Sequence, residues 1–421
     1  MRRKKYVFTI CLAACAIWVA GCGGSSSGTT TTVSVSGLKK RVLITNSQSG
    51  AVQLLDGQND KFNRALLTAS PTRIVTSGGM SVVLNSGALT VAVIDNTKET
   101  VSAVTSLLNT ASDVAISTDG KTGYAAVRNS GLVEIFSTAS GNLVTTVTVP
   151  SVSRLVMGPK GHKLLAFADD PQTLPGANAN AFFVIDTASN TVTAIQGPVG
   201  SQPYTAVFDT SDANDTTAFI LFCGPECAGT AASAGVSKVN FSGAPVFNPA
   251  SPIPVGGATV GVLSGSNLFV AGTPQPPGPL PGCTLVSCGS LQVINTGTLT
   301  AGPIVPITDG LHTQMAVTSN NHVYVGASSC TPGVVVNNQV RGCLSIYNTG
   351  VAVSASNPSF PVESAFRADL NVTGFQIISG RNVIYVIQGG ELDIFDFTTD
   401  SLTANQLDIV GHAVGVVQID P

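Results

Sequence analysis

A loosely repeated segment is the sequence feature that most restricts how this chain can fold. The segment NAFFVIDTASNTVTAI begins at Asn180, and loose copies of it begin at Leu89, Gly131 and Gly390. Each copy has the composition of a strand, a short polar turn and a second strand. Aligning the residue that ends the first of these strands gives Asp56, Asp95, Ser137, Asp186, Asn240, Asn295, Asn348 and Asp396. The sequence therefore predicts eight units of similar structure.

One unit, residues 112 to 149, shows what each of them contains. The apolar runs SDVAIS, TGYAAV, LVEIFS and LVTTVTV are separated by the turn sequences TDGK, RNSG and TASGN. The aligned residues recur at intervals of 39 to 55 residues. Four short strands in a repeat of this size are typical of a β-propeller, in which each blade is one four-stranded antiparallel sheet. We predict an all-β propeller of eight four-stranded blades. Seven blades are the alternative, because the turn sequences are weaker in blades 5 to 7.

The two ends of the repeated region complement each other. The region opens with RVLITNS, which matches the second strand of the other units, so blade 1 lacks its innermost strand. The segment GVVQID, residues 415 to 420, matches the first strands of the other units. We predict that this C-terminal strand joins blade 1 and closes the ring, which removes the open sheet edges.

The repeat also resembles that of a known family. The stretch STDGKTGYAAVRNSGLVEIFSTASGNLV is similar to the repeat of the YVTN-type propellers, and the similarity recurs over residues 41 to 420. Thr118 stands where that family has proline, and blades 5 to 7 lack the Asp-Gly-Lys turn. Some members of the family resemble lactonases that hydrolyse sugar lactones. The resemblance therefore implies a lactonase-like hydrolase as one possible function.

The N-terminal segment has the features of an export signal. Four basic residues are followed by an apolar run and by small residues before Cys22, which is typical of a secretory signal peptide. The tetrad VAGC, residues 19 to 22, resembles the lipobox of bacterial lipoproteins, which implies a lipid on Cys22. A plain signal peptide with a chance cysteine is the alternative. We predict a signal peptide over 1–21, a lipidated Cys22 with a flexible tether over 22–38, and the propeller over 39–421. Gly23 implies the outer membrane by analogy with lipoprotein sorting.

Four long insertions are predicted between the second and third strands of consecutive blades. They cover residues 169–179, 224–235, 272–289 and 328–342 of blades 4 to 7. In an antiparallel blade these 2–3 loops share one face with the links between blades, whereas the short 1–2 and 3–4 turns share the other. Long loops on a rigid scaffold are where binding residues accumulate. We therefore predict that the face with the 2–3 loops is the functional one.

The six cysteines after Cys22 form three local pairs within those insertions. The pairs are Cys223 with Cys227, Cys283 with Cys288 and Cys330 with Cys343. In an exported protein such pairs are expected to form disulfides. Metal binding is the alternative, but no further His or Cys residues lie at zinc-like spacing.

Residues just before each innermost strand are expected to surround the mouth of the central channel. They are Arg73, Asp113, Arg154, Tyr204, Thr259, Gln314, Phe375, His412 and Val414. Mixed charged, amide and aromatic groups around one opening could orient a small polar ligand or the end of a peptide. The alternative is that these groups pair with one another and with water.

Chemistry beyond binding has little support in the sequence. The four histidines are dispersed, and His162 and His322 are expected to be solvated turn residues. Without residues 1–21 the formal net charge changes from −3 to −7, which argues against nucleic acid as a partner. We predict no catalytic residue, metal or cofactor.

These observations favour a monomeric, membrane-anchored binding or scaffold protein rather than an enzyme. It would be exported, lie in the bacterial cell envelope, and bind an unknown envelope or extracellular protein, or a small polar ligand, through the 2–3 loops of blades 4 to 7. The alternatives are a lactonase-like hydrolase acting at the channel mouth, a periplasmic partner in an envelope assembly, and a spacer.

Overall fold

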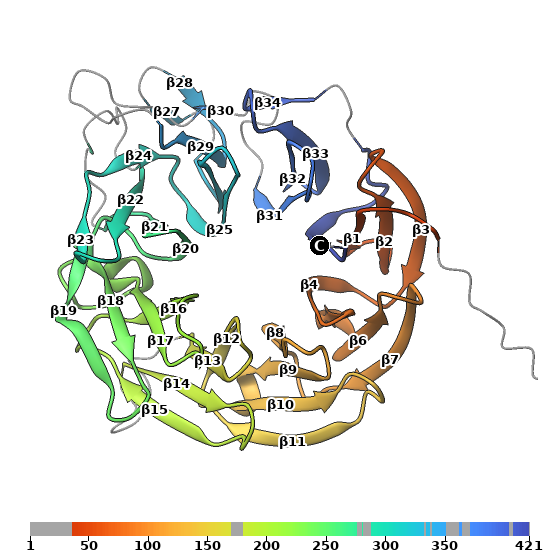
Figure 1. The fold of residues 1–421 in the computed structure, drawn as a ribbon, viewed down its shortest axis with the longest axis horizontal. Helices are drawn as coiled ribbons and strands as arrows, with labels where there is room; N and C mark the ends of the chain where they lie inside the picture. The colour runs from red at the N-terminus through yellow and green to blue at the C-terminus, as the bar shows by residue number, and fades with distance from the viewer. Residues whose placement is uncertain are drawn as a thin grey trace, which may run out of the picture. The chain divides into compact units, whose positions relative to one another are not determined.

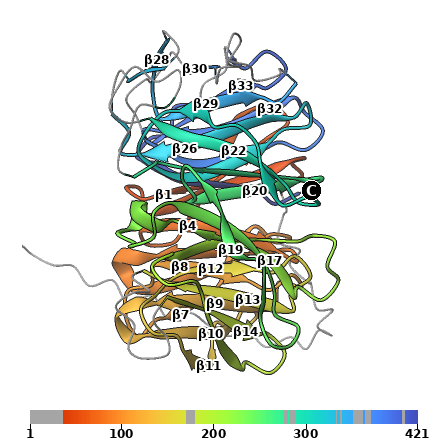
Figure 2. The ribbon, with the colours of Figure 1, turned by 90° about the vertical axis from the view of Figure 1, so that its left-hand side faces the viewer.

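Eight antiparallel sheets form a closed ring in the computed structural model of this protein (Figure 1). The structure describes residues 36–169, 180–275, 280, 288–331, 334–336, 339–350, 362–363, 371–403 and 407–420. They belong to the compact unit Val35–Pro421. Seen from the side, the strands of each sheet run between the two faces of the ring (Figure 2).

The first four blades have the expected four strands each, and two of them include a short 3-10 turn. Blade 1 contains β1 (Arg41–Asn46), β2 (Ala51–Asp56), β3 (Lys61–Leu67) and β35 (Ala413–Gln418). Blade 2 contains β4 (Pro71–Ser77), β5 (Met80–Asn85), η1 (Ser86–Ala88), β6 (Thr90–Asp95) and β7 (Thr100–Ser106). Blade 3 contains β8 (Asp113–Ile116), β9 (Thr122–Val127), η2 (Arg128–Ser130), β10 (Leu132–Ser137) and β11 (Leu143–Thr148). Blade 4 contains β12 (Val152–Met157), β13 (Lys163–Ala168), β14 (Ala181–Asp186) and β15 (Val192–Gln196).

The other four blades keep this order but vary in their outermost strands. Blade 5 contains β16 (Pro203–Phe208), β17 (Thr217–Phe222), η5 (Gly224–Cys227), β18 (Ala234–Asn240) and β19 (Val246–Val255). Blade 6 contains β20 (Val260–Ser264), β21 (Asn267–Gly272), β22 (Gly289–Asn295), β23 (Thr300–Ala301) and β24 (Val305–Ile307). Blade 7 contains β25 (Leu311–Val317), β26 (His322–Ser328), β29 (Leu344–Asn348) and β30 (Val362–Glu363), with the separate hairpin of β27 (Val334–Val336) and β28 (Gln339–Arg341). Blade 8 contains β31 (Val372–Ile377), β32 (Val383–Gln388), β33 (Glu391–Asp396) and β34 (Ser401–Leu402).

The ring is closed by the C-terminal strand, as predicted. β35 pairs with β1 in antiparallel register, with Val42 opposite Gln418 and Ile44 opposite Val416. The guanidinium of Arg41 pairs with Asp420 at 2.6 Å just beyond this strand. The prediction of eight blades is confirmed, and the alternative of seven is wrong.

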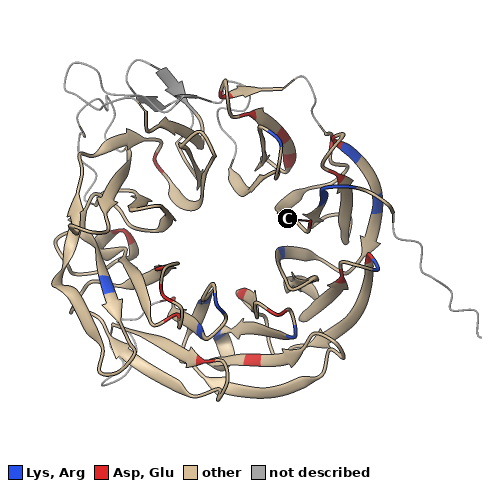
Figure 3. Ribbon diagram, viewed as in Figure 1, with Lys and Arg blue, Asp and Glu red and all other residues tan. Residues whose placement is uncertain are grey.

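The packing of the blades explains why the chain has few charged residues. Eight apolar clusters each lie between two neighbouring blades, so every sheet buries both of its faces. In blade 3 the inner strand β9 is almost fully buried, whereas every residue of the outermost strand β11 is at least partly exposed. Charges are accordingly sparse on the ribbon (Figure 3). Burying each Val, Leu or Ile stabilises the fold by about 1.5 to 3 kcal/mol.

The polar residue that repeats through the sequence has a local structural cause. Each of the eight aligned positions is the last residue of the third strand in its blade. At seven of them the side-chain oxygen accepts a hydrogen bond from the backbone N–H two residues later, as Asp56 does from Gln58 at 2.9 Å. This bond defines an Asx turn, which Asp and Asn favour. The repeat therefore marks the entry to each 3–4 turn.

Candidate binding site

The innermost strands begin on the face that carries the 2–3 loops, and most of them begin irregularly. The pairing register shifts near the first residues of six of these strands, β4, β12, β16, β25, β31 and β35. Such β-bulges add one residue and redirect the neighbouring side chains. Seven of the nine predicted mouth residues lie within the innermost strands instead of before them. Thr259, which directly precedes β20, and His412, which directly precedes β35, are the exceptions.

Arg73 and Asp113 form an ion pair at the inner edge of blades 2 and 3. Nε of Arg73 lies 2.6 Å from Oδ1 of Asp113, and the arginine side chain is 48% exposed whereas that of the aspartate is 2% exposed. The N–H of Leu155 in blade 4 donates to Oδ2 of Asp113 at 2.8 Å, and the N–H of Val114 donates to Oδ1. Burial raises the pKa of Asp113, while Arg73 and these N–H groups oppose the rise. Asp113 therefore holds three blades together and fixes Arg73.

Arg154 and Tyr204 form a second pair across blades 4 and 5. The guanidinium carbon of Arg154 lies 3.7 Å from the centre of the Tyr204 ring. Its Nη2 donates to the phenol oxygen at 2.7 Å, and its Nη1 donates to the backbone carbonyl at 3.2 Å. This cation–π contact and these hydrogen bonds satisfy Arg154 within the wall of the channel.

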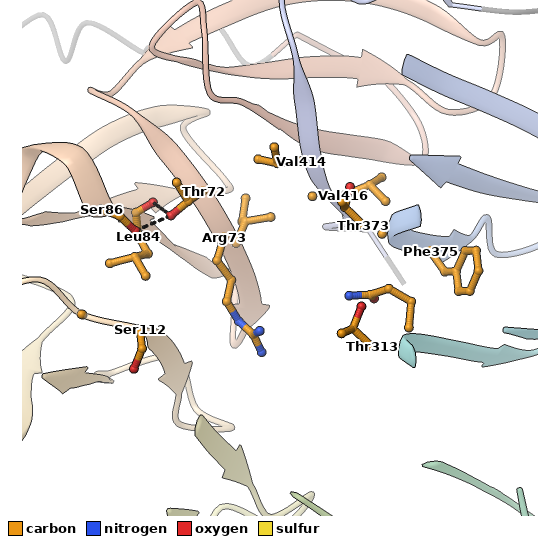
Figure 4. Close-up of a pocket in the computed structure, with 15 residues that line it drawn as sticks. Thr72, Arg73, Leu84, Ser86, Ser112, Thr313, Thr373, Phe375, Val414 and Val416 are labelled. Carbon is orange, nitrogen blue, oxygen red and sulfur yellow. Dashed lines mark hydrogen bonds between the residues drawn. The ribbon is translucent and has the colours of Figure 1, made fainter. Parts of the chain in front are cut away.

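Three cavities lie along the channel and share Arg73 in their linings. The largest, about 510 Å³, is shown in Figure 4 and is bounded by residues of blades 1, 2, 7 and 8 and by the segment before β8. The second, about 220 Å³, also has Arg154 and Thr259 in its lining. The third, about 380 Å³, extends between blades 2, 3 and 4. Arg73 and Arg154 are the only charged residues in these linings.

Three of the four remaining predicted mouth residues line the cavities, and the fourth does not. Gln314 lines the first two cavities, and Val414 lines the first. Phe375 also lines the first, and its ring packs edge-on against Tyr324 with centroids 6.2 Å apart. His412 lies outside the three linings, because its backbone N–H donates to Asn46 and its carbonyl accepts from Ser47 where the ring closes.

Two of the three predicted disulfides lie within the described residues. Cys223 bonds to Cys227 around η5, and Cys330 bonds to Cys343 across the insertion that contains β27 and β28. Cys288 is also disulfide-bonded, and its predicted partner Cys283 lies outside the described residues, as does Cys22.

The described parts of the 2–3 loops bond to neighbouring blades. Arg128 in the loop of blade 3 pairs with Asp169 of blade 4 at 2.5 Å. In blade 7, the N–H of Thr331 donates to Asp309 at 2.7 Å, and Ser329 donates to Asn371 before blade 8. The insertions are thus fixed at their ends by side chains of the adjoining blades.

Glu226 lies in the insertion of blade 5, and its carboxyl points toward blade 6. It lies on η5 inside the Cys223–Cys227 loop, close to the backbone of Thr273 and Ala258 in blade 6. Burial raises the pKa of Glu226 to about 8. Gly272 leaves room for this carboxyl, since a Cβ there would lie 2.5 Å from Oε2. No local signal in the sequence indicates this contact.

His322 is also placed differently from the prediction. It is the first residue of β26, and its Nδ1 lies 2.7 Å from Asp400 in the 3–4 turn of blade 8. It is buried instead of solvated. The local sequence does not indicate this pair, because 78 residues separate the two partners.

Two features are absent from the part of the chain that the structure describes. No three His, Cys, Asp or Glu side chains there are arranged to hold a metal ion. None of the helices there has the length and apolar character needed to cross a membrane.

The closed ring and its central channel define an eight-bladed β-propeller with a polar channel mouth. No protein-family model matches the chain, and no curated protein sequence matches it. Among solved structures, dihydro-heme d1 dehydrogenase NirN in complex with DHE aligns with a TM-score of 0.64 and 12% identity, over 90% of this chain and 75% of that one.

Two further propellers align with TM-scores of 0.52. Apo AztD from Citrobacter koseri is 11% identical over 89% of this chain and 96% of its own. BamB from Moraxella catarrhalis is 13% identical over 82% and 90%. Identities this low show a shared fold alone.

Proposed function

We propose that this propeller is an exported, lipid-anchored binding protein of the bacterial cell envelope that contacts a protein partner through the face with the 2–3 loops. The observation that carries the proposal is that the described parts of these loops are bonded to the rest of the fold. Disulfides close the insertions of blades 5 and 7, and a hydrogen bond from Ser329 and the ion pair of Arg128 join described loop residues to the next blade. A surface ordered before binding loses less conformational entropy when a partner is bound.

The interblade contacts continue along this face. The N–H of Ala231 in the blade 5 loop donates to Gly200 at the end of blade 4, and the hydroxyl of Thr273 in blade 6 donates to Gly310 before blade 7. Together with Glu226 and Ser329, they join blades 4 to 8 by contacts at the roots of the loops. The opposite face carries short turns such as Thr118–Lys121 instead of long insertions. This asymmetry supports recognition on the loop face.

The proposed address rests on the N-terminal sequence and on the disulfides. The VAGC tetrad supports acylation of Cys22, and the following Gly/Ser/Thr residues support a flexible tether with a mean reach of roughly 20 Å. Two complete disulfides are typical of an oxidising compartment. Gly23 favours the outer membrane.

A lactonase-like hydrolase at the channel mouth is the second candidate, because Arg73, Asp113 and Arg154 do come together there. The state of Asp113 favours binding over hydrolysis. Both of its oxygens already accept backbone N–H groups, and Oδ1 also pairs with Arg73. A general base must instead be free to accept a proton from the reacting group.

Affinity capture from envelope extract tests the proposal. The baits are the intact protein and a variant in which loops 272–289 and 328–342 are shortened to tight turns. The matched control shortens the 1–2 turn of blade 5, residues 209–216, on the opposite face. We expect the intact protein and the control to capture the same proteins, and the loop variant to lose them while keeping its melting temperature within a few degrees.

Two results would contradict the proposal. One is capture of the same proteins by all three baits. The other is hydrolysis of a lactone by the intact protein at an enzyme-like rate that Asp113→Asn abolishes, which would establish the hydrolase instead.

A further inference from the structure

The channel contains one guanidinium that is only partly satisfied. Both terminal amino groups of Arg154 donate hydrogen bonds to Tyr204. Arg73 pairs with Asp113 through Nε, and within the described residues its two terminal amino groups have no hydrogen-bond partner. About half of its side chain is exposed, and Figure 4 shows it reaching from β4 into the largest cavity. A fork of N–H donors is therefore directed into open space.

The groups opposite Arg73 are also polar. Thr313 and Gln314 of β25 line both the 510 Å³ and the 220 Å³ cavities, so with Arg73 they mark the place where the two meet. Figure 4 shows Thr313 across the cavity from Arg73. A hydroxyl and a side-chain amide can each donate a hydrogen bond to the same acceptor as the guanidinium.

The charge balance of the channel favours an anion. Arg73 and Arg154 both line the 220 Å³ cavity, whereas Asp113 is absent from all three linings and lies buried behind Arg73. Two guanidinium groups thus face one carboxylate, in a protein whose formal net charge is negative. The ion pair with Asp113 uses one edge of Arg73 and leaves the terminal edge, whose parallel N–H groups match the two oxygens of a carboxylate.

We infer that the channel mouth binds a carboxylate, held by the terminal amino groups of Arg73 with Thr313 and Gln314 as further donors. The rest of the ligand occupies the 510 Å³ cavity, whose lining includes the hydroxyls of Thr72, Ser86, Ser112 and Thr373 and the ring of Phe375. Thr72 and Ser86 already bond to each other at 2.7 Å, which fixes that wall. A small organic acid and the C-terminus of a peptide both present this chemistry. The inference does not depend on partner binding by the 2–3 loops.

Ligand-observed NMR and calorimetry on the purified full-length protein test this site with defined probes. Lactate represents a small acid and trialanine represents a peptide end, with lactamide and trialanine amide as matched neutral compounds. We expect at least one acid to bind and its amide not to bind. We also expect Arg73→Met to weaken binding about tenfold or more, as loss of a charge-assisted hydrogen bond requires. Arg73→Lys should restore part of the affinity.

Arg128→Met provides the matched control, because Arg128 lies on the same face, is 51% exposed and also pairs with an aspartate, but is outside the cavities. The Arg128→Met protein should bind the acids as the wild type does.

Binding of lactate alone would identify a small-acid site, and binding of trialanine alone would identify a peptide-end site. Absence of binding by both acids, equal binding of the amides, or unchanged affinity in a folded Arg73→Met protein would overturn the inference. The loop-shortened bait should still bind the acid, so failure of the proposed partner recognition would be seen separately.

Discussion

At the scale of single residues, buried carboxylates in the 3–4 turns join neighbouring blades. Tyr385 of blade 8 and Arg381 both donate to Asp60 of blade 1, and Tyr324 of blade 7 donates to Asp400 of blade 8 at 2.9 Å. The two aspartates have φ of 54° and 51°, a left-handed conformation that non-glycine residues rarely adopt. Tyr324 and Tyr385 therefore each join two neighbouring blades.

Removing one of these phenol groups should weaken the ring. We expect Tyr385→Phe to lower the free energy of unfolding by about 1 to 3 kcal/mol, because buried Asp60 loses a donor. Tyr124→Phe is the matched control, since Tyr124 occupies the same place in blade 3 and its hydroxyl has no hydrogen bond to a described residue. Urea unfolding at neutral pH measures both. Equal losses for the two variants would show that the bond to Asp60 contributes nothing.

Glu226 should make stability depend on pH. Its pKa is raised by burial from 4.5 to about 8 in the folded protein, so between these values the folded state holds one more proton than the unfolded state. The unfolding free energy must then fall as pH rises through this interval. We expect Glu226→Gln to be more stable than the wild type by about 1 to 3 kcal/mol at pH 8.5, and by much less at pH 4.5. A difference independent of pH, measured by thermal or urea unfolding, would refute this.

At the scale of elements, locally encoded features could be predicted from the sequence. The strand ends were predictable because Asp56 and its equivalents bond to their own turns. The positions of the insertions followed from the same alignment. The bulges that bring Arg73 into its strand, and the contact of Glu226 with blade 6, were not predictable, because each depends on a neighbouring strand or blade. The association of Arg73 with Asp113 was suggested only by their shared place at the mouth.

The disulfides allow a test at this scale. Peptide mapping without reduction should find the links 223–227, 283–288 and 330–343 and no others. In the chain-entropy view, replacing Cys330 and Cys343 by serine should cost about 2 to 3 kcal/mol, because the closed loop holds some 13 residues, and replacing Cys223 and Cys227 should cost less. Links between different pairs would show that the insertions are arranged otherwise.

At the scale of the whole molecule, the closing strand decides whether the ring is continuous. Deleting residues 415–420 removes most of β35 and exposes the inner edge of β1. Such an edge pairs readily with other chains. We therefore expect the truncated protein to aggregate in light scattering. A soluble truncation with unchanged melting temperature would show that closure adds little.

The lipid anchor is likewise tested on the intact protein. Mass spectrometry of the native N-terminus should find the mature chain beginning at an acylated Cys22. An unmodified cysteine, or a mature chain that begins elsewhere, would exclude lipid anchoring.

Ring closure also affects the order in which the blades can be completed during synthesis. Of the described strands, β1 is synthesised first and β35 last, so blade 1 is the first blade to begin and the last to be completed. Blades 2 to 8 can form from continuous segments as they are synthesised, but the inner edge of β1 stays unpaired until β35 has been made. The pairing of β1 with β35 joins the two ends of the propeller sequence, and contacts between residues so far apart in the sequence form slowly. The emerging chain is therefore most exposed to misassembly at β1, the strand that it produced first.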